Sequence, residues 1–133
     1  KMQLNIMTDY AIRMVLYLAD CDQTASGTQI SETMAIPPSM ITTMSPKLRK
    51  AGIITTQRGT NGGYRLAKEP EDISLAEIIN VMESTTCLNH CLEADHYCSR
   101  GAAETCPVRE FYAQMQKVLH ETFSQKSIAS LMK

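Results

Sequence analysis

The chain has 133 residues, 44% of them apolar, which fits one globular domain with a core of ordinary size. No stretch approaches the roughly 18 uninterrupted apolar residues that a membrane-spanning helix needs, and Asp9 and Arg13 interrupt the one segment that resembles the core of a signal peptide. We therefore expect a soluble, cytoplasmic protein with no membrane partner. The net charge of −1 is unevenly distributed: residues 33–68 hold six basic and no acidic residues, and the rest of the chain holds all 14 acids and the other seven bases. A local positive field of this kind favours a polyanionic partner.

Apolar residues at helical spacing predict two helices in the first 35 residues. The first has Thr8 as its N-cap and ends near Asp22, before a polar stretch. The second covers residues 28–35. The sequence 36-IPP-38 that follows forces an extended corner, because the residue before a proline avoids the helical conformation.

A third helix is predicted from Ser39 to Gly52, where the glycine ends it. Pro46 lies inside this helix, where a proline removes one hydrogen bond and clashes with the preceding turn at a cost of about 3 kcal/mol. Because Ser45-Pro46 also resembles the start of a helix, we expect a kink or a split at this point.

Two short strands, 53–58 and 64–67, flank a glycine-rich tip and predict a β-hairpin. The sequence 58-RGTNGGYRLA-67 supplies glycines for positive φ angles and places an arginine on each arm. Three helices followed by a hairpin, with the acid-free segment on the third helix and the hairpin, are the element order of a winged helix-turn-helix. The predicted fold class is therefore mainly α with a small β-hairpin.

The predicted DNA-binding residues lie on the solvent face of the third helix and along the hairpin. The helix would enter the major groove, and the hairpin tip would follow the phosphate backbone or reach into the minor groove. Hydroxyl groups bind several base edges and phosphates, so they do not identify the sequence that is read. The candidates are Ser39, Thr42, Thr43, Lys47, Arg49, Arg58, Asn61 and Arg65. The alternative is that these residues only keep the surface solvated.

Two more helices are predicted beyond the hairpin. One begins at Ile73-Ser74 and buries an apolar face, and a long one runs from Pro107 to about Gln125. The long helix carries an apolar stripe that a small domain cannot cover, which favours a two-fold dimer that reads two half-sites of a palindromic operator. The alternative is that this helix packs back on the first helix of its own chain.

The segment between these helices, 87-CLNHCLEADHYCSRGAAETCP-107, contains four of the five cysteines. Structural zinc sites usually have paired C-x2-4-C motifs, and only Cys87 and Cys91 approach that spacing, so zinc is the less favoured metal. The wider intervals between Cys91, Cys98 and Cys106 place three thiols on a loop that can surround a larger group. Because thiolates are the usual ligands of iron–sulfur clusters, this spacing favours such a cluster.

Cys106 directly precedes Pro107, the predicted first residue of the long helix. The positive end of a helix favours a thiolate and stabilises an anionic cluster, but it also makes a free thiol reactive. The sequence thus leaves a cluster site and a thiol-based redox switch both open. His90 and His96 are candidate ligands or merely exposed side chains, and Cys21 is expected to be a packing residue.

Several motifs are typical of one family: 8-TDYAIR-13, 36-IP-37, 48-LRKAGII-54, 58-RGTNGGYRLA-67, 73-ISLAEIINVME-83 and the series Cys91, Cys98 and 106-CPVRE-110. Over nearly its full length the chain thereby resembles the Rrf-type family of bacterial winged-helix transcriptional regulators, in particular its cluster-binding, NsrR-like members. The resemblance implies that Ser39, Thr42 and Arg58 contact DNA.

The resemblance also implies that the three widely spaced cysteines ligate a [2Fe–2S] or [4Fe–4S] cluster, which air easily removes. The fourth ligand varies within the family. An aspartate at the start of the first helix, donated by the other subunit, matches Asp9 here. Arg109 stands where other members have a histidine ligand, and an arginine does not bind iron. Cys87 is an additional thiol and the alternative to Asp9.

We therefore expect a homodimeric transcriptional repressor with residues 1–84 as the DNA-binding domain, residues 85–106 as the cluster-binding loop, and residues 107–133 as a dimerisation helix followed by a short helix. It would sense redox conditions, nitric oxide or iron–sulfur status through the cluster. The alternative is a cluster-free regulator that senses through thiols or contains zinc. The sequence has no nucleotide-binding loop and no H-E-x-x-H or G-x-S-x-G motif, so we do not expect an enzyme.

Overall fold

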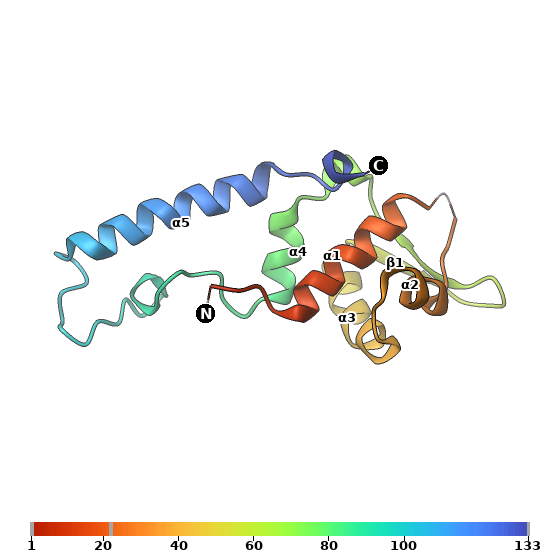
Figure 1. Ribbon diagram of the computed structural model, residues 1–133, viewed down its shortest axis with the longest axis horizontal. Coiled ribbons are helices and arrows are strands. Elements are labelled where there is room, and N and C mark those ends of the chain that lie inside the picture. Colours follow the sequence, from red (N-terminus) through yellow and green to blue (C-terminus); the bar gives the residue numbers. More distant parts are fainter. Residues whose placement is uncertain (1, 22, 133) are drawn as a thin grey trace.

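A computed structural model describes residues 2–21 and 23–132, and within them the chain forms five α-helices, one two-stranded sheet and three short 3-10 turns (Figure 1). The predicted class, mainly α with a small β-hairpin, is confirmed. In the part of the chain that the structure describes, no helix is both long and apolar enough to cross a membrane. The helices and strands are α1 (Ile6–Ala19), α2 (Gly27–Met34), α3 (Pro38–Lys50), β1 (Ile54–Gln57), β2 (Gly63–Leu66), α4 (Leu75–Met82) and α5 (Pro107–Gln125).

The first helix begins earlier than predicted. Its N-cap is Asn5, whose side-chain oxygen accepts a hydrogen bond from a backbone N–H of the first turn at 2.9 Å. Thr8, the predicted cap, lies inside the helix, where its side chain is fully buried and donates to the carboxylate of Glu83. The helix ends at Ala19, a few residues short of the predicted end; Asp22 itself lies outside the described residues.

The third helix is continuous through Pro46, so the predicted split is wrong. Met44 and Leu48, on either side of the proline, are fully buried, and their packing holds the helix together despite a local cost of about 3 kcal/mol. The carbonyl that would have accepted the missing N–H belongs to Thr42, which is exposed, so water can satisfy it. Tertiary packing therefore overrides the local signal of Ser45-Pro46.

The two strands form the predicted antiparallel hairpin, with Ile54 opposite Leu66. The backbone of Ala25 adds a bridge to β2: its N–H donates to the Tyr64 carbonyl at 2.9 Å, and the Tyr64 N–H donates back at 2.8 Å. At Gly63, where φ is 150°, a Cβ atom would lie 2.1 Å from the Ala25 carbonyl oxygen, so only glycine allows this approach. The hairpin is thereby fixed to the segment that leads into α2.

The core joins elements that are far apart in the sequence. α1 packs against α3 and α4, and the predicted apolar face of α4 is buried. The segment after α5 also enters the core, because the side chain of Ile128 is fully buried and its N–H donates to the Ile73 carbonyl at 2.8 Å. The largest fully buried side chains are Met14, Val15, Ile30, Ile36, Met44, Leu48, Ile53, Ile54, Ile73, Ile78, Ile79 and Ile128.

The molecule is elongated, with the hairpin at one end and the cysteine-rich segment at the other (Figure 1). α5 starts beside the cysteine-rich segment and runs back towards α4, and its main contacts are with α4 and the 3-10 turn His90–Leu92 rather than with α1. No residue of α5 is buried. Its outward apolar side chains, each between 40% and 57% exposed, are Val108, Phe111, Met115 and Val118.

Candidate functional site

The predicted DNA-reading face of α3 is exposed. Ser39, Thr42 and Thr43 all have exposed side chains. The Thr42 hydroxyl donates to the Pro38 carbonyl at 3.1 Å, and the Thr43 hydroxyl donates to the Ser39 carbonyl at 2.9 Å. Because a hydroxyl oxygen keeps its lone pairs when it donates, both groups can still accept a hydrogen bond from a base or a water molecule.

The cations of residues 33–68 are largely without acidic partners. Among the residues that the structure describes, Lys68 is the one cation of this segment in a salt bridge, with Glu77 at 2.6 Å. Arg49 donates to the Thr56 hydroxyl at 3.5 Å, which links α3 to β1. A positive surface without carboxylates is suited to a phosphate backbone. The other exposed candidates are Lys47, Arg58, Asn61 and Arg65.

At the opposite end of the molecule, three cysteines line one cavity of about 380 Å³. Cys91 lies in the turn His90–Leu92, Cys98 lies in the loop that follows, and Cys106 is the N-cap residue of α5. Cys91 is buried, and the other two are half-buried. The fold therefore brings together the three widely spaced thiols that the sequence singled out.

The rest of the cavity wall combines apolar, uncharged polar and cationic side chains. Val108 and Tyr112 of α5 supply apolar surface, and Arg100 and Arg109 supply guanidinium groups. Within the described residues, the lining contains no carboxylate. The cavity therefore offers a favourable environment for a bound anion.

Backbone N–H groups are directed at the Cys98 thiol. Hydrogen bonds from the N–H groups of Ala102 and Arg100 lower the pKa of Cys98 below its ordinary value. The N–H of Gly101 and the charge of Arg100 act in the same direction, and partial burial opposes them. This loop thus favours the thiolate, which is the form of cysteine that binds metals and attacks electrophiles.

Polar groups also lie beside the other two thiols. The sulfur of Cys91 accepts a hydrogen bond from the side-chain amide of Asn89 at 3.4 Å. Cys106 precedes α5 without a side-chain capping bond, so the first N–H groups of this helix have no side-chain partner. The positive end of a helix beside the cavity again favours an anion.

This donor set fits an iron–sulfur cluster better than a single metal ion. Throughout residues 2–21 and 23–132, no three side chains of His, Cys, Asp or Glu lie close enough together to hold one ion. Three thiols around a wider cavity would instead supply three of the four ligands of an anionic cluster, and the two guanidinium groups and the helix N-terminus beside them suit its negative charge.

Both histidines of the segment have neighbours that hold them. His90 Nε2 lies 3.1 Å from the Asp95 carboxylate, and its ring packs against Tyr97. The Tyr97 N–H and His90 lower the pKa of Asp95 below its ordinary value. His96 Nδ1 lies 2.6 Å from the guanidinium of Arg109.

The two candidates for a fourth ligand do not line this cavity. Asp9 forms a salt bridge with Arg13 at 2.8 Å, and Arg13 also donates to the Met34 carbonyl at 3.1 Å at the end of α2. Cys87 lies nearby in the sequence, but its thiol is directed at the carbonyl of Leu92 at 3.7 Å. Within one chain, neither side chain joins the three grouped thiols.

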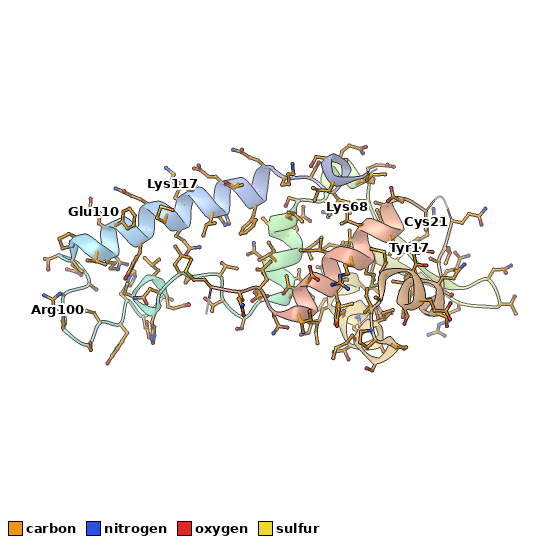
Figure 2. The ribbon with its side chains drawn as sticks, in the orientation of Figure 1. Tyr17, Cys21, Lys68, Arg100, Glu110 and Lys117 are labelled. Carbon is orange, nitrogen blue, oxygen red and sulfur yellow. The ribbon has the colours of Figure 1, made fainter. Side chains whose placement is uncertain are left out.

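Cys21 is remote from the other cysteines. It lies at the C-terminal end of α1, whereas Arg100 marks the cysteine-rich segment at the far end of the molecule (Figure 2). Its side chain is half-buried against the core, as expected for a packing residue. It is therefore a natural control for the other thiols.

Sequence reasoning missed the residues that attach the cysteine-rich segment to the rest of the fold. The Gln116 side chain accepts from the Leu88 N–H at 2.7 Å and donates to the Thr86 carbonyl at 2.8 Å. Arg109 Nε donates to the Cys91 carbonyl at 3.0 Å. These partners lie 18 to 30 residues apart in the chain, so no local pattern distinguishes such side chains from solvated ones.

A sequence profile described as "Rrf2: Iron-dependent Transcriptional regulator" matches residues 4–133. The chain belongs to the Rrf2 family. It is 34% identical over 125 residues to the HTH-type transcriptional regulator NsrR of Shouchella clausii, an alignment that covers 92% of this chain and 78% of that protein. As an Rrf2 protein, the chain is a DNA-binding transcriptional regulator and not an enzyme.

Solved structures agree with the winged-helix fold of the Rrf2 family. CymR (YrzC), the global cysteine regulator of B. subtilis, superposes with a TM-score of 0.81 at 23% identity, over 97% of this chain and 95% of that one. IscR of T. potens superposes with a TM-score of 0.77 at 23% identity, over 97% of this chain and 85% of that one.

Proposed function

We propose that this Rrf2 regulator is a homodimeric, cytoplasmic repressor that senses redox conditions, nitric oxide or iron–sulfur status through a cluster held by Cys91, Cys98 and Cys106. The observation that carries the proposal is the single cavity lined by these three thiols together with Arg100 and Arg109. The iron dependence in the family description and the relative named NsrR support an iron-containing sensor. A [2Fe–2S] or [4Fe–4S] cluster would supply one-electron redox chemistry at this site.

For DNA binding, we propose that α3 enters the major groove of a palindromic double-stranded operator and that the hairpin contacts its backbone or minor groove. Exposed hydroxyls on α3 and exposed cations without acidic partners support these contacts. The proposed contact residues are Ser39, Thr42, Thr43, Lys47, Arg49, Arg58, Asn61 and Arg65.

The exposed apolar face of α5 supports the dimer. Three large apolar side chains, Phe111, Met115 and Val118, are solvent-exposed in the single chain although they recur at helical spacing. A second copy that packs its own α5 on this face would bury them around a two-fold axis. The two hairpins would then be related by the same axis, which matches the symmetry of a palindromic operator.

The fold connects the cavity with the DNA-binding domain. α5 begins directly after its N-cap residue Cys106, beside the cavity, and packs on α4. Glu83, the residue after α4, binds the first turn of α1, and α1 packs on α3. A cluster would shift DNA affinity only if the cluster-bound and cluster-free arrangements of these helices differ in affinity for DNA.

For the fourth ligand, we propose Asp9 of a second copy, with Cys87 as the alternative. Asp9 would have to leave its salt bridge with Arg13, which is exposed and therefore contributes about 0–1 kcal/mol. Asp9→Asn and Cys87→Ala variants separate the two candidates, because only loss of the true ligand changes the visible spectrum of the reconstituted protein.

The function is tested by an anaerobic ultraviolet–visible spectrum with iron, sulfide and zinc analysis. Wild type and Cys21→Ala, the matched control, should show broad visible absorption together with iron and sulfide, and Cys98→Ala should lose both. A colourless wild-type protein that contains no iron after anaerobic reconstitution would contradict the cluster proposal. Zinc bound in its place would favour a structural metal.

The second candidate is a cluster-free regulator that senses oxidants through its thiols. The lowered pKa of Cys98, caused first by the N–H of Ala102, favours this candidate because a thiolate reacts faster than a thiol. Its signature is DNA release by peroxide from colourless protein, reversed by dithiothreitol and abolished in Cys98→Ser.

A further inference from the structure

We propose that Arg109 holds the cysteine-rich segment in place and contributes an uncompensated positive charge to the three-thiol cavity. The charge part of this inference rests on the proposed cluster, whereas the positioning part concerns the cluster-free protein alone. Arg109 lies in the first turn of α5, three residues after Cys106.

The positioning role follows from two hydrogen bonds to different parts of the segment. Arg109 Nε donates to the Cys91 carbonyl at 3.0 Å, and one of its terminal nitrogens lies 2.6 Å from His96 Nδ1. Both partners precede α5, and they lie on either side of the Glu93–Asp95 stretch. One rigid guanidinium on a helix thus fixes two points of an otherwise irregular loop.

The backbone at these points needs such support. His96 has φ of 50°, in the left-handed region that non-glycine residues rarely adopt. Cys91 is buried at 8% exposure, although it lies in a turn of only three residues, which packs on α5. The two bonds from Arg109 therefore account for both the strained backbone and the buried thiol.

The charge role follows from what surrounds Arg109. It lies between the three-thiol cavity and a second cavity of about 520 Å³, and lines both. The second cavity includes the side chain of Glu104, yet among the described residues no carboxylate lies within salt-bridge distance of Arg109. Because the guanidinium of Arg109 binds a carbonyl and an imidazole instead of a carboxylate, no negative side chain offsets its positive charge beside the three thiols.

These roles predict different effects for two substitutions. Lysine keeps the positive charge but lacks the planar guanidinium that binds two partners at once. Glutamine lacks the guanidinium and also removes the charge. A nearby cation favours the extra negative charge of a reduced cluster, so its removal should lower the reduction potential. Arg109→Gln should therefore lower the potential, while Arg109→Lys should keep it near that of wild type.

The positioning role is tested in the cluster-free protein by iodoacetamide labelling of Cys91, quantified by peptide mass spectrometry with Cys21 as the internal standard. In both Arg109 variants, iodoacetamide should react with Cys91 roughly tenfold faster than in wild type, because a charge-assisted hydrogen bond that holds the turn is lost. Arg100→Gln, which removes the other guanidinium of the cavity, is the matched control and should label like wild type. Unchanged Cys91 labelling in both Arg109 variants would overturn the positioning role.

The charge role is tested by spectroelectrochemical titration of the reconstituted proteins. Equal reduction potentials in wild type and Arg109→Gln would overturn the charge role. It would also be overturned if the reduction potential of Arg109→Lys were as low as that of Arg109→Gln. If wild type takes up no iron while the Arg109 variants still expose Cys91, the proposed cluster function fails and the positioning role stands. Circular dichroism melting confirms that each variant is folded.

Discussion

The hydroxyl of Thr8, fully buried in α1, donates a hydrogen bond to the carboxylate of Glu83, the residue that follows α4. The same carboxylate accepts the backbone N–H of Asn5 at 2.8 Å, so Glu83 closes the start of α1 from a position 78 residues away in the chain. Glu83 also leads directly into the cysteine-rich segment. It therefore joins the start of α1 to the part of the chain that leads into the cysteine-rich segment.

Replacing Thr8 with Val should destabilise the protein. The substitution keeps the shape of the side chain but removes the donor, which leaves the Glu83 carboxylate short of a partner at a cost of about 1–3 kcal/mol. Urea unfolding followed by circular dichroism measures this cost. Thr42→Val is the control, because the Thr42 hydroxyl is exposed and donates only within its own helix. Equal stability of the two variants would contradict a special role for the Thr8 hydroxyl.

Replacing Gly63 with Ala should detach the hairpin from Ala25. The new Cβ atom would lie 2.1 Å from the Ala25 carbonyl oxygen in a backbone with φ of 150°, which we expect to cost about 2 kcal/mol or more. Gly52→Ala is the control: its φ is 78°, nothing lies within 4 Å of its Cβ, and strain alone should cost about 1 kcal/mol. Thermal unfolding measures the stability of both variants. A larger loss of stability in Gly52→Ala than in Gly63→Ala would contradict the steric explanation.

Replacing Arg58 with Ala should weaken DNA binding roughly tenfold and reduce the salt dependence of the affinity by about one ion, as expected when one phosphate contact is lost. Fluorescence anisotropy at several salt concentrations, with a duplex selected from a random library, measures both quantities. Lys117→Ala removes the same charge from α5, where Lys117 lies well away from the hairpin (Figure 2). If Lys117→Ala weakens DNA binding as much as Arg58→Ala does, the loss of affinity comes from the change in net charge and not from a contact of the hairpin.

Replacing Phe111 with Glu should dissociate the dimer. The Phe111 side chain is 57% exposed in the single chain, so the substitution costs the monomer little, whereas a charge in an apolar interface is strongly unfavourable. Analytical ultracentrifugation reports the mass. Ala113→Glu places the same charge on a different side of α5 and should leave the dimer intact. A Phe111→Glu protein that still sediments as a dimer would place the interface elsewhere.

Local patterns predicted most of the elements but not their attachments. Apolar spacing predicted both bounds of α5 and the start of α4 to within two residues, because amphipathic helices depend on residues within the same segment. The start of α1 was wrong because Asn5 and Thr8 are both good N-cap residues, and the distant Glu83 decided between them. Of the predicted kink or split at Pro46, the split was wrong for a similar reason, since the buried residues around it outweigh the local penalty.

The candidate sites followed the same division. The spacing of Cys91, Cys98 and Cys106 was sufficient to group them, and the absence of acids marked the basic surface of α3 and the hairpin. The partners of Arg109 could not be anticipated, because they depend on how the loop folds against α5. The sequence thus indicated the candidate residues, and the structure was needed to find which side chains lie beside them.

The pairing of Ile128 with Ile73 has a consequence for how the protein is made. Ile128 is fully buried in the hydrophobic core with residues of α1, α3 and α4, so this core cannot be completed on the ribosome until residue 128 has emerged from the exit tunnel. By then the whole intervening segment, with its three grouped cysteines, has already been synthesised. A nascent chain therefore contains all three cysteines of the cavity before its hydrophobic core is complete. The long loop between Ile73 and Ile128 also slows the last step of folding, in which Ile128 enters the core.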